Sequence, residues 1–186
     1  MISRRQILAF LCSIATLPLR ANTSHKIPLA DIPLSVHESA MREAIKVAQL
    51  NPDFPFGAVI INAISGKVVA RGVNTSRVNP TFHGEIVCMN NYIEKFGNKG
   101  WSDHILYTTG EPCPMCMAAL TWADIQGVVY GSSIETISRS GIGQINISAQ
   151  SVIEATDFKK PELLGGVLTQ ACDELFTMRK RKADES

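Results

Sequence analysis

Two short motifs in this chain supply three candidate metal ligands and one further carboxylate. They are Thr-Phe-His-Gly-Glu at positions 81–85 and Pro-Cys-Pro-Met-Cys at positions 112–116. The imidazole of His83 and the thiolates of Cys113 and Cys116 are ligand types that zinc prefers. A zinc ion with three protein ligands keeps a fourth position for water and lowers the pKa of that water to about 7. The motifs therefore predict a catalytic zinc centre that activates water as a nucleophile.

The spacing of these residues suits one metal and one separate acid-base group. Cys113 and Cys116 stand at positions i and i+3, so they share one face if the segment is helical, and Pro112 before them is typical of a helix entry. The positive end of the helix dipole favours the thiolate form of both cysteines. Glu85 follows His83 by two residues, which on a helix directs its carboxylate away from the ligand direction. We therefore expect Glu85 to act as a proton shuttle beside the metal.

Each motif also has a simpler interpretation when it stands alone. Pro-Cys-x-x-Cys is typical of a redox pair or of half a structural zinc ribbon. The sequence has no second Cys-x-x-Cys, and Cys12, Cys88 and Cys172 are isolated, which argues against a closed four-cysteine site. A zinc-stabilised binding protein without catalysis remains an alternative, against which the presence of Glu85 argues. Cys88 and Cys172 are expected to be buried as small apolar side chains.

The order His-x-Glu and then Pro-Cys-x-x-Cys is similar to the signature of zinc-dependent deaminases. From about Ser35 to about Met178 the chain resembles the cytidine and deoxycytidylate deaminase superfamily, in the branch of guanine deaminases and tRNA adenosine deaminases. The resemblance extends to ordered segments at residues 54–60, 72–74, 79–81, 106–109 and 118–123. It implies that the three ligands named above bind Zn²⁺ and that Glu85 is the catalytic proton shuttle.

The same resemblance implies a set of substrate contacts. Asn74 is expected to hydrogen-bond the substrate ring, Phe56 to form a pocket wall, and Gly84 to lie against the substrate. A plain turn residue is the alternative for Asn74, and a core aromatic is the alternative for Phe56. Where guanine deaminases carry a substrate-reading aspartate, this chain has Gln144 within residues 141–144 and no carboxylate. An amide can donate and accept whereas a carboxylate only accepts, so Gln144 is expected to read a different ring edge.

The implied reaction is hydrolytic deamination. Glu85 takes a proton from the activated water, hydroxide attacks the ring carbon that bears the exocyclic amine, and Glu85 returns protons to the ring nitrogen and the leaving ammonia. Several segments look like those of bacterial guanine deaminases, so a free nucleobase or nucleoside, guanine-like in its ring, is the favoured substrate. A cytosine-type base is an alternative, because glycine after His83 resembles fungal cytosine deaminases. The backbone consequence of that glycine is expected to be small.

Deamination of adenosine in tRNA is a second alternative. Residues 164–176 resemble the terminal helix of tRNA adenosine deaminases, and a basic cluster follows at residues 179–182. That cluster is also typical of a solvated helix end. A tRNA-binding protein is expected to be basic overall, whereas this chain has 18 Lys and Arg, 17 Asp and Glu, and a net charge of +1. A small molecule is therefore the expected partner, and nucleic acid is not.

Residues 1–21 have the pattern of an export signal. Arg4 and Arg5 precede an apolar run at residues 7–19, Ala21 follows it, and the paired arginines resemble a twin-arginine signal. The run is too short for an ordinary membrane span, so export to the periplasm without a stable span is expected. A retained anchor or a cytoplasmic extension is the alternative. Removal of this segment would delete three of the 18 basic residues and none of the 17 acidic ones, which leaves a net charge of −2.

The remaining chain predicts a linker at residues 22–34, one deaminase domain at 35–182 and a tail at 183–186. Ser35 and Glu38 predict a capping box for a helix that ends near residue 50. Apolar, β-branched runs predict a hairpin of two strands at residues 56–61 and 67–73. Helices are then predicted at residues 83–96 and 113–124, and they alternate with strands at residues 105–108 and 128–130. Residues 142–155 are ambiguous. This alternation predicts an α/β fold, a three-layer α/β/α sandwich with a mixed central sheet, and the resemblance implies a homodimer.

Overall fold

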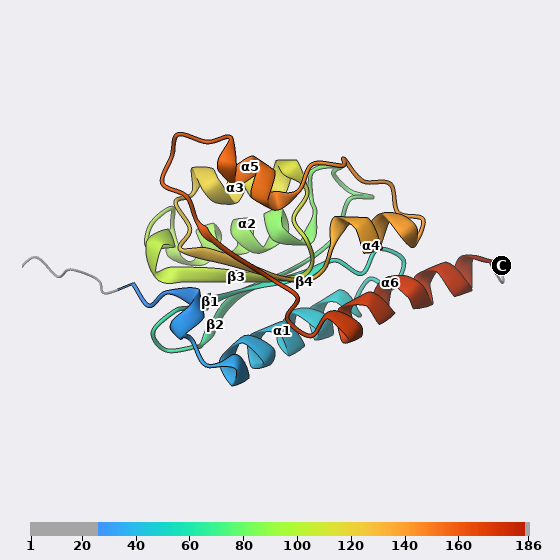
Figure 1. Ribbon diagram of the computed structural model, residues 1–186, viewed down its shortest axis with the longest axis horizontal. Helices are drawn as coiled ribbons and strands as arrows, with labels where there is room; N and C mark the ends of the chain where they lie inside the picture. Colours follow the sequence, from blue (N-terminus) through green and yellow to red (C-terminus); the bar gives the residue numbers. More distant parts are fainter. Residues whose placement is uncertain (1–25, 185–186) are drawn as a thin grey trace, which may run out of the picture.

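The computed structural model describes residues 26–184. Within this part of the chain the strands form one five-stranded sheet in the order β2-β1-β3-β4-β5 (Figure 1). The strands are β1 (Gly57–Asn62), β2 (Val68–Val73), β3 (His104–Gly110), β4 (Gly127–Ser132) and β5 (Glu162–Gly165). The predicted export signal at residues 1–21 lies outside the described residues.

The sheet is mixed, as predicted. β1 pairs antiparallel with β2 and with β3, while β3, β4 and β5 run parallel to one another. β1 is buried except for Asn62, and β3 is buried except for His104, which fits strands that are covered on both faces. The predicted hairpin between β1 and β2 is present, and Gly66 supplies the positive φ of +65° in its turn.

Helices cover both faces of the sheet, which confirms the predicted three-layer α/β/α sandwich (Figure 1). One face carries α1 (Leu34–Ala48) and α6 (Thr169–Asp184). The opposite face carries α2 (Gly84–Phe96), α3 (Pro114–Trp122) and α5 (Ala149–Glu154). A further short helix, α4 (Ile134–Arg139), follows β4.

The core is divided by the sheet into two hydrophobic clusters. Leu106 of β3 packs with Met117 and other residues on the side of α2 and α3. Its neighbour Tyr107 packs with Met41 and Ala44 on the side of α1. Successive residues of a strand point to opposite faces of the sheet, so β3 serves both layers. Because helices bury both faces, the strands keep a fixed position from which their ends can hold a site.

The predicted capping box at the start of α1 is wrong. The helix begins at Leu34 with Pro33 as its N-cap residue, and no side chain caps it. The fixed φ of Pro33 allows the helix to start directly after it, which leaves Ser35 inside the first turn rather than at the cap. Part of the segment predicted as a linker packs onto the fold, since Leu29 is buried and its backbone N–H donates to the carboxylate of Glu162 over 2.8 Å.

The ambiguous segment at residues 142–155 contains a loop followed by the short helix α5. α5 lies beside α3 on the face of the sheet that also carries α2 (Figure 1). No helix among residues 26–184 combines the length and the apolar character that crossing a membrane requires.

Candidate active site

A cavity of about 160 Å³ gathers most of the predicted site residues. Its walls come from the segments before β1, after β2 and after β3, from the first turn of α2, and from the loop between α4 and α5. The lining residues are Phe54, Phe56, Asn74, Ser76, His83, Glu85, Glu111, Cys113, Ile142, Gly143 and Gln144. The cavity lies beyond the carboxyl end of β3, where ligands commonly bind in sheets that contain parallel strands.

The three predicted metal ligands converge where two helices begin. His83 is the N-cap residue of α2 and Cys113 is the N-cap residue of α3, with Cys116 in the first turn of α3. One donor atom from each residue lies within 4.8 Å of the other two, and His83 Nδ1 is 3.5 Å from Cys113 Sγ. Neither N-cap side chain caps its own helix, so both donor atoms remain available. An imidazole and two thiolates this close together fit a tetrahedral zinc ion with one open position.

The electrostatics of the cluster also fit a metal. A hydrogen bond from the Cys116 thiol, together with the contact to His83, lowers the pKa of Cys113 to about 4. The hydrogen bond to Cys113 raises the pKa of His83. Cys113 also stands at the N-terminus of α3, where the helix dipole favours a negative charge. These contacts favour the thiolate form of Cys113, which is the form of cysteine that binds zinc. The hydrogen bond to Cys113, together with burial, raises the pKa of Cys116.

Glu85 is the buried acid-base group of the cavity. It lies in the first turn of α2 and its residue is 3% exposed. Thr108 Oγ1 of β3 donates a hydrogen bond to Glu85 Oε1 over 3.0 Å. Burial raises the pKa of the Glu85 carboxyl above its ordinary value, because low polarity disfavours the charged form. A carboxyl group in such a site can accept a proton and return it within one reaction.

Asn74 makes a turn and also lines the cavity, so its contact with the substrate ring stays a prediction. Its Oδ1 accepts hydrogen bonds from the backbone N–H and the hydroxyl of Ser76, over 3.0 and 2.8 Å. Its Nδ2 has no hydrogen-bond partner among the described residues. Every fully buried side-chain nitrogen or oxygen atom in those residues does have a partner. Nδ2 is therefore accessible, and Asn74 lines the cavity. The amide is oriented to donate a hydrogen bond to a ligand.

Phe56 is likewise both a wall of the cavity and part of a small hydrophobic cluster. Its ring stacks on His83 with centroids 6.5 Å apart and an interplanar angle of 17°. On the other side it contacts Phe176 of α6, with centroids 5.1 Å apart. Ile137 and Ile142 complete the cluster. The terminal helix thus supports the aromatic wall from outside.

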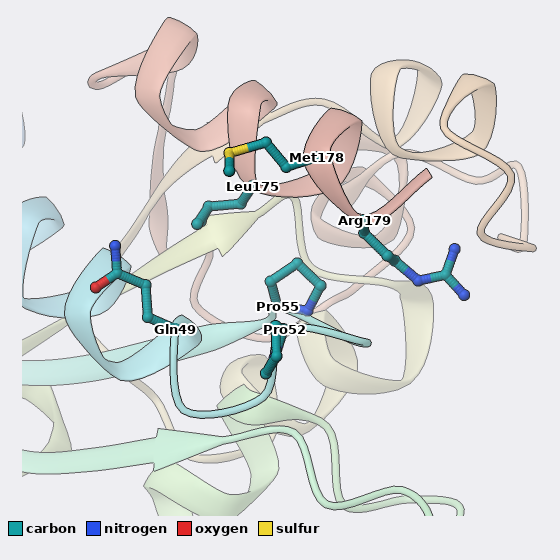
Figure 2. A pocket seen from close by; sticks show the side chains of 6 residues that line it. All are labelled: Gln49, Pro52, Pro55, Leu175, Met178 and Arg179. Carbon is teal, nitrogen blue, oxygen red and sulfur yellow. The ribbon is translucent and has the colours of Figure 1, made fainter. Parts of the chain in front are cut away.

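Further along α6, a groove of about 150 Å³ separates the helix from the segment that leads into β1 (Figure 2). Arg179 bridges the two sides. Its Nε donates to the carbonyl oxygen of Asp53, and its guanidinium lies 4.9 Å from the centre of the Phe54 ring. Phe54 lines the cavity, so the first residue of the basic cluster at 179–182 is connected to the candidate site.

Gly84 is not among the residues that line the cavity. It is buried, and a Cβ atom at this position would lie 2.6 Å from the carbonyl oxygen of Phe56. That oxygen accepts the backbone N–H of Asn74 over 2.9 Å. The expectation that glycine here has a small backbone consequence is therefore wrong, because the start of α2 packs directly on the backbone before β1.

Comparison with known proteins identifies the family. A model of the cytidine and deoxycytidylate deaminase zinc-binding region matches residues 34–132. The chain belongs to the cytidine and deoxycytidylate deaminase family. It is therefore a deaminase by family, and its His-Cys-Cys cluster falls within the zinc-binding region of that family.

The relatives of this deaminase include tRNA adenosine deaminases and a guanine deaminase. The chain is 29% identical to a tRNA-specific adenosine deaminase of Rickettsia bellii over 135 residues, which are 70% of this chain and 90% of the relative. It is 34% identical to the guanine deaminase of Bacillus subtilis over 111 residues, which are 56% of this chain and 70% of the relative. A guanine deaminase structure from Nitrosomonas europaea matches with a TM-score of 0.68 at 21% identity, over 77% of this chain and 84% of that one. At this identity the match supports the fold alone.

Several residues that line the cavity of this deaminase were missed from the sequence. Phe54, Ser76, Ile142 and Gly143 belong to loops, whose path depends on contacts distant in sequence. Glu111 had a visible signal, because it is a carboxylate directly before the Pro-Cys-x-x-Cys motif. The structure shows that it is buried and lines the cavity.

Proposed function

We propose that this protein catalyses the zinc-dependent hydrolytic deamination of a free nucleobase or nucleoside and releases ammonia. The observation that carries the proposal is the convergence of His83, Cys113 and Cys116 within 4.8 Å next to the buried carboxyl of Glu85, which lines one cavity together with His83 and Cys113. Pockets for drug-sized ligands usually enclose about 300–1,000 Å³. A cavity of about 160 Å³ is smaller and suits one planar base.

In this proposal a zinc ion held by the three ligands supplies the activation of water at neutral pH. Glu85 takes one proton from the water, and the oxygen forms a bond to the ring carbon that bears the amine. Glu85 delivers that proton to the ring nitrogen. It then takes the second proton from the newly bonded oxygen and delivers it to the amine, which leaves as ammonia as the carbon–nitrogen bond breaks and the carbonyl forms. The Thr108 hydroxyl keeps the Glu85 carboxyl in place, and Asn74 donates a hydrogen bond to an acceptor on the ring.

The proposed substrate is guanine-like. The similarity to the guanine deaminase of Bacillus subtilis supports this choice, and the folds of other guanine deaminases are compatible with it. Besides Glu85, the one carboxylate that lines the cavity is Glu111, and both of its oxygens already accept backbone N–H groups. Recognition of the base is therefore assigned to neutral side chains, chiefly the amides of Asn74 and Gln144. Because these amides differ from the carboxylate expected in guanine deaminases, a cytosine-type base is retained for testing.

Deamination of adenosine in tRNA is the second candidate, and the similarity to the Rickettsia bellii enzyme favours it. A flipped base could occupy the same cavity while the rest of the nucleic acid stays outside. The net charge of +1 argues against it, because phosphate contacts dominate such affinity. The contact of Arg179 with Phe54 also gives one member of the basic cluster a role inside the protein.

The test is ammonia release by the zinc-loaded protein with guanine, adenine, cytosine, their nucleosides and a tRNA as substrates. Turnover of guanine or another free base would support the first proposal, and turnover of the tRNA alone would replace it with the second. Glu85→Gln is the control, and it should reduce kcat by about 100-fold to 10,000-fold because it removes general acid-base catalysis. A reaction that survives this change unaltered would contradict the assigned mechanism.

We also propose that the protein is exported through residues 1–21 and forms a homodimer. The paired arginines before an apolar run support the first proposal, and the family resemblance supports the second. Cell fractionation with N-terminal sequencing tests export, and sedimentation of the purified protein tests the dimer. A protein found only in the cytoplasm, or only as a monomer, would contradict the corresponding proposal.

A further inference from the structure

Glu111 accepts hydrogen bonds from two segments that are far apart in the chain. It follows β3 and comes two residues before Cys113. Its Oε2 accepts the backbone N–H of Ile134 over 3.0 Å, and its Oε1 accepts the backbone N–H of Ala149 over 2.9 Å. The residue is only 8% exposed. Hydrogen bonds between an ionised carboxylate and backbone N–H groups are stronger than neutral ones.

The two N–H groups belong to the first residues of α4 and α5. Each helix already has a serine cap, since the hydroxyl of Ser133 accepts the N–H of Thr136 and the hydroxyl of Ser148 accepts the N–H of Ser151. The serines leave the N–H groups of the first helical residues without an intrahelical acceptor. One carboxylate therefore completes the start of both helices, and its charge is favourable beside their positive ends.

The loop between these two helices forms one wall of the candidate site. Ile142, Gly143 and Gln144 line the cavity, and residues 140–148 contain no helix or strand. Ile142 packs in the small cluster with Phe176, but Gly143 and the residues from 145 to 148 are exposed. Since few apolar contacts hold this loop, the hydrogen bonds at its flanking helices decide where Gln144 lies.

We propose that Glu111 is a positioning residue that fixes the loop at residues 140–148, and through it Gln144, against the cavity. Glu111 couples two parts of the site, because the chain continues from it to the ligand Cys113 on one side while its carboxylate holds the loop on the other. The fixing of the loop follows from the contacts of Glu111 alone. Its effect on substrate selection rests on the proposed function.

Glu111→Gln tests this role with little change of shape. The glutamine oxygen can still accept one N–H, but its Nε2 is a donor and meets the other N–H group, which is then buried without an acceptor. Glu135→Gln is the matched control, because Glu135 is an exposed residue of α4 whose contact is an ion pair with Arg139. It removes the same charge from the neighbourhood without changing the contacts of Glu111.

The first measurement is amide hydrogen exchange of the full protein with its zinc content determined in parallel. In Glu111→Gln we expect exchange at Ile134 or Ala149 to be at least about tenfold faster, since a net hydrogen bond is lost. Zinc content should stay as in the wild type, and Glu135→Gln should exchange as the wild type does. Unchanged exchange at both amides, or loss of zinc, would overturn the proposal. If Glu111→Gln fails to fold, Glu111→Asp, which shortens the reach of the carboxylate, replaces it in the same measurement.

The second measurement is steady-state kinetics on the substrate found in the activity test. Glu111→Gln should raise KM about tenfold and change kcat less, because a displaced wall weakens binding of substrate and transition state alike. Faster exchange with an unchanged KM would overturn the effect on substrate binding. Faster exchange in Glu111→Gln, combined with a wild type that deaminates none of the substrates, would support the fixing of the loop by Glu111 and reject the proposed function. The two failures are therefore distinguishable.

Discussion

Thr108 holds the carboxyl group of Glu85 from the strand beneath it. Thr108 Oγ1 donates to Glu85 Oε1 over 3.0 Å, and Thr108 is fully buried. The next residue, Thr109, points the other way, where its hydroxyl donates to the Pro55 carbonyl and accepts the Gly57 N–H. Adjacent threonines at the end of β3 thus hold the acid-base group and the segment that carries Phe56, because strand residues alternate between faces.

Thr108→Val should lower kcat with little effect on zinc content. Valine keeps the shape of threonine but removes the donor, so one oxygen of the Glu85 carboxyl loses its hydrogen bond. A hydrogen bond to a charged group contributes roughly 1.5–3 kcal/mol, so we expect a decrease in kcat of at least about tenfold. Thr108→Ser retains the hydroxyl and should restore most of the rate. Equal rates for the valine variant and the wild type would show that this contact does not assist Glu85.

Removal of the metal should abolish activity and lower the thermal unfolding midpoint. A strong chelator would remove the metal itself. Cys116→Ser would remove one of the three ligands, which His83 and Cys113 complete at the start of α3. We expect the activity to fall by at least about 100-fold, because water is no longer activated, and the midpoint to fall because metal binding stabilises the folded state. Cys88→Ala is the control, since Cys88 is buried in the core and is not part of the ligand group. Metal analysis should find zinc retained in that variant and lost in Cys116→Ser.

The parts of the site that were predicted from the sequence are those set by local geometry. Cysteines at i and i+3 share a helix face, and Pro112 indicated that a helix begins nearby. In the structure Pro114 occupies the first helical position. The expected helices at 83–96 and 113–124 begin at Gly84 and Pro114, one residue later than predicted. His83 and Cys113 are N-cap residues for that reason, and their side chains turn to a shared centre instead of to solvent.

The parts that could not be predicted depend on contacts between distant residues. α4 and α5 have six residues each, too few for a clear periodicity. Glu111, which holds them, is 23 residues from Ile134 and 38 residues from Ala149. The packing of Gly84 on Phe56 is likewise a tertiary contact. A sequence pattern reports which face of an element is apolar, but not which backbone group will lie against it.

Gly84→Ala should destabilise the protein and weaken substrate binding. The added Cβ would lie 2.6 Å from the Phe56 carbonyl oxygen, so the backbone that carries Phe56 and bonds Asn74 must shift. We expect a loss of stability of about 1–3 kcal/mol from this overpacking, measured by urea unfolding, and a higher KM. Gly143→Ala is the control for stability, since a Cβ there meets nothing within 4 Å. Equal stability of Gly84→Ala and the wild type would contradict the close packing.

Asn74→Asp should lower kcat/KM by at least about tenfold, since it removes the donor that faces the cavity and adds a negative charge beside the base. Aspartate can still accept both hydrogen bonds from Ser76, so the turn should persist. Asn79→Asp is a close control, because Asn79 Oδ1 accepts from the N–H and hydroxyl of Thr81 at the same 3.0 and 2.8 Å without lining the cavity. Similar losses of kcat/KM in the two variants would show that the substitutions act by disturbing the turns and not by weakening substrate binding.

Arg179 offers a test between an internal role and a nucleic-acid contact. It lines the groove between α6 and the segment before β1 (Figure 2). It also donates to the Asp53 carbonyl oxygen and lies over the ring of Phe54. Both contacts use the planar guanidinium, which lysine lacks. Arg77 pairs with the side chain of the same Asp53 over 2.9 Å and is exposed, so Arg77→Ala removes an equal charge nearby.

Arg179→Lys should therefore raise KM for the base about as much as Arg179→Ala does, by roughly threefold to tenfold, because lysine lacks the planar guanidinium that stacks on Phe54 and donates from Nε to the Asp53 carbonyl oxygen. Arg77→Ala should leave KM unchanged. A phosphate contact would behave differently, since lysine can replace arginine as a point charge and the loss in Arg179→Ala would depend on salt. Steady-state kinetics with a free base at two salt concentrations measures the difference. If Arg179→Lys matches the wild type while Arg179→Ala loses only tRNA binding, α6 contacts nucleic acid and the internal role is wrong.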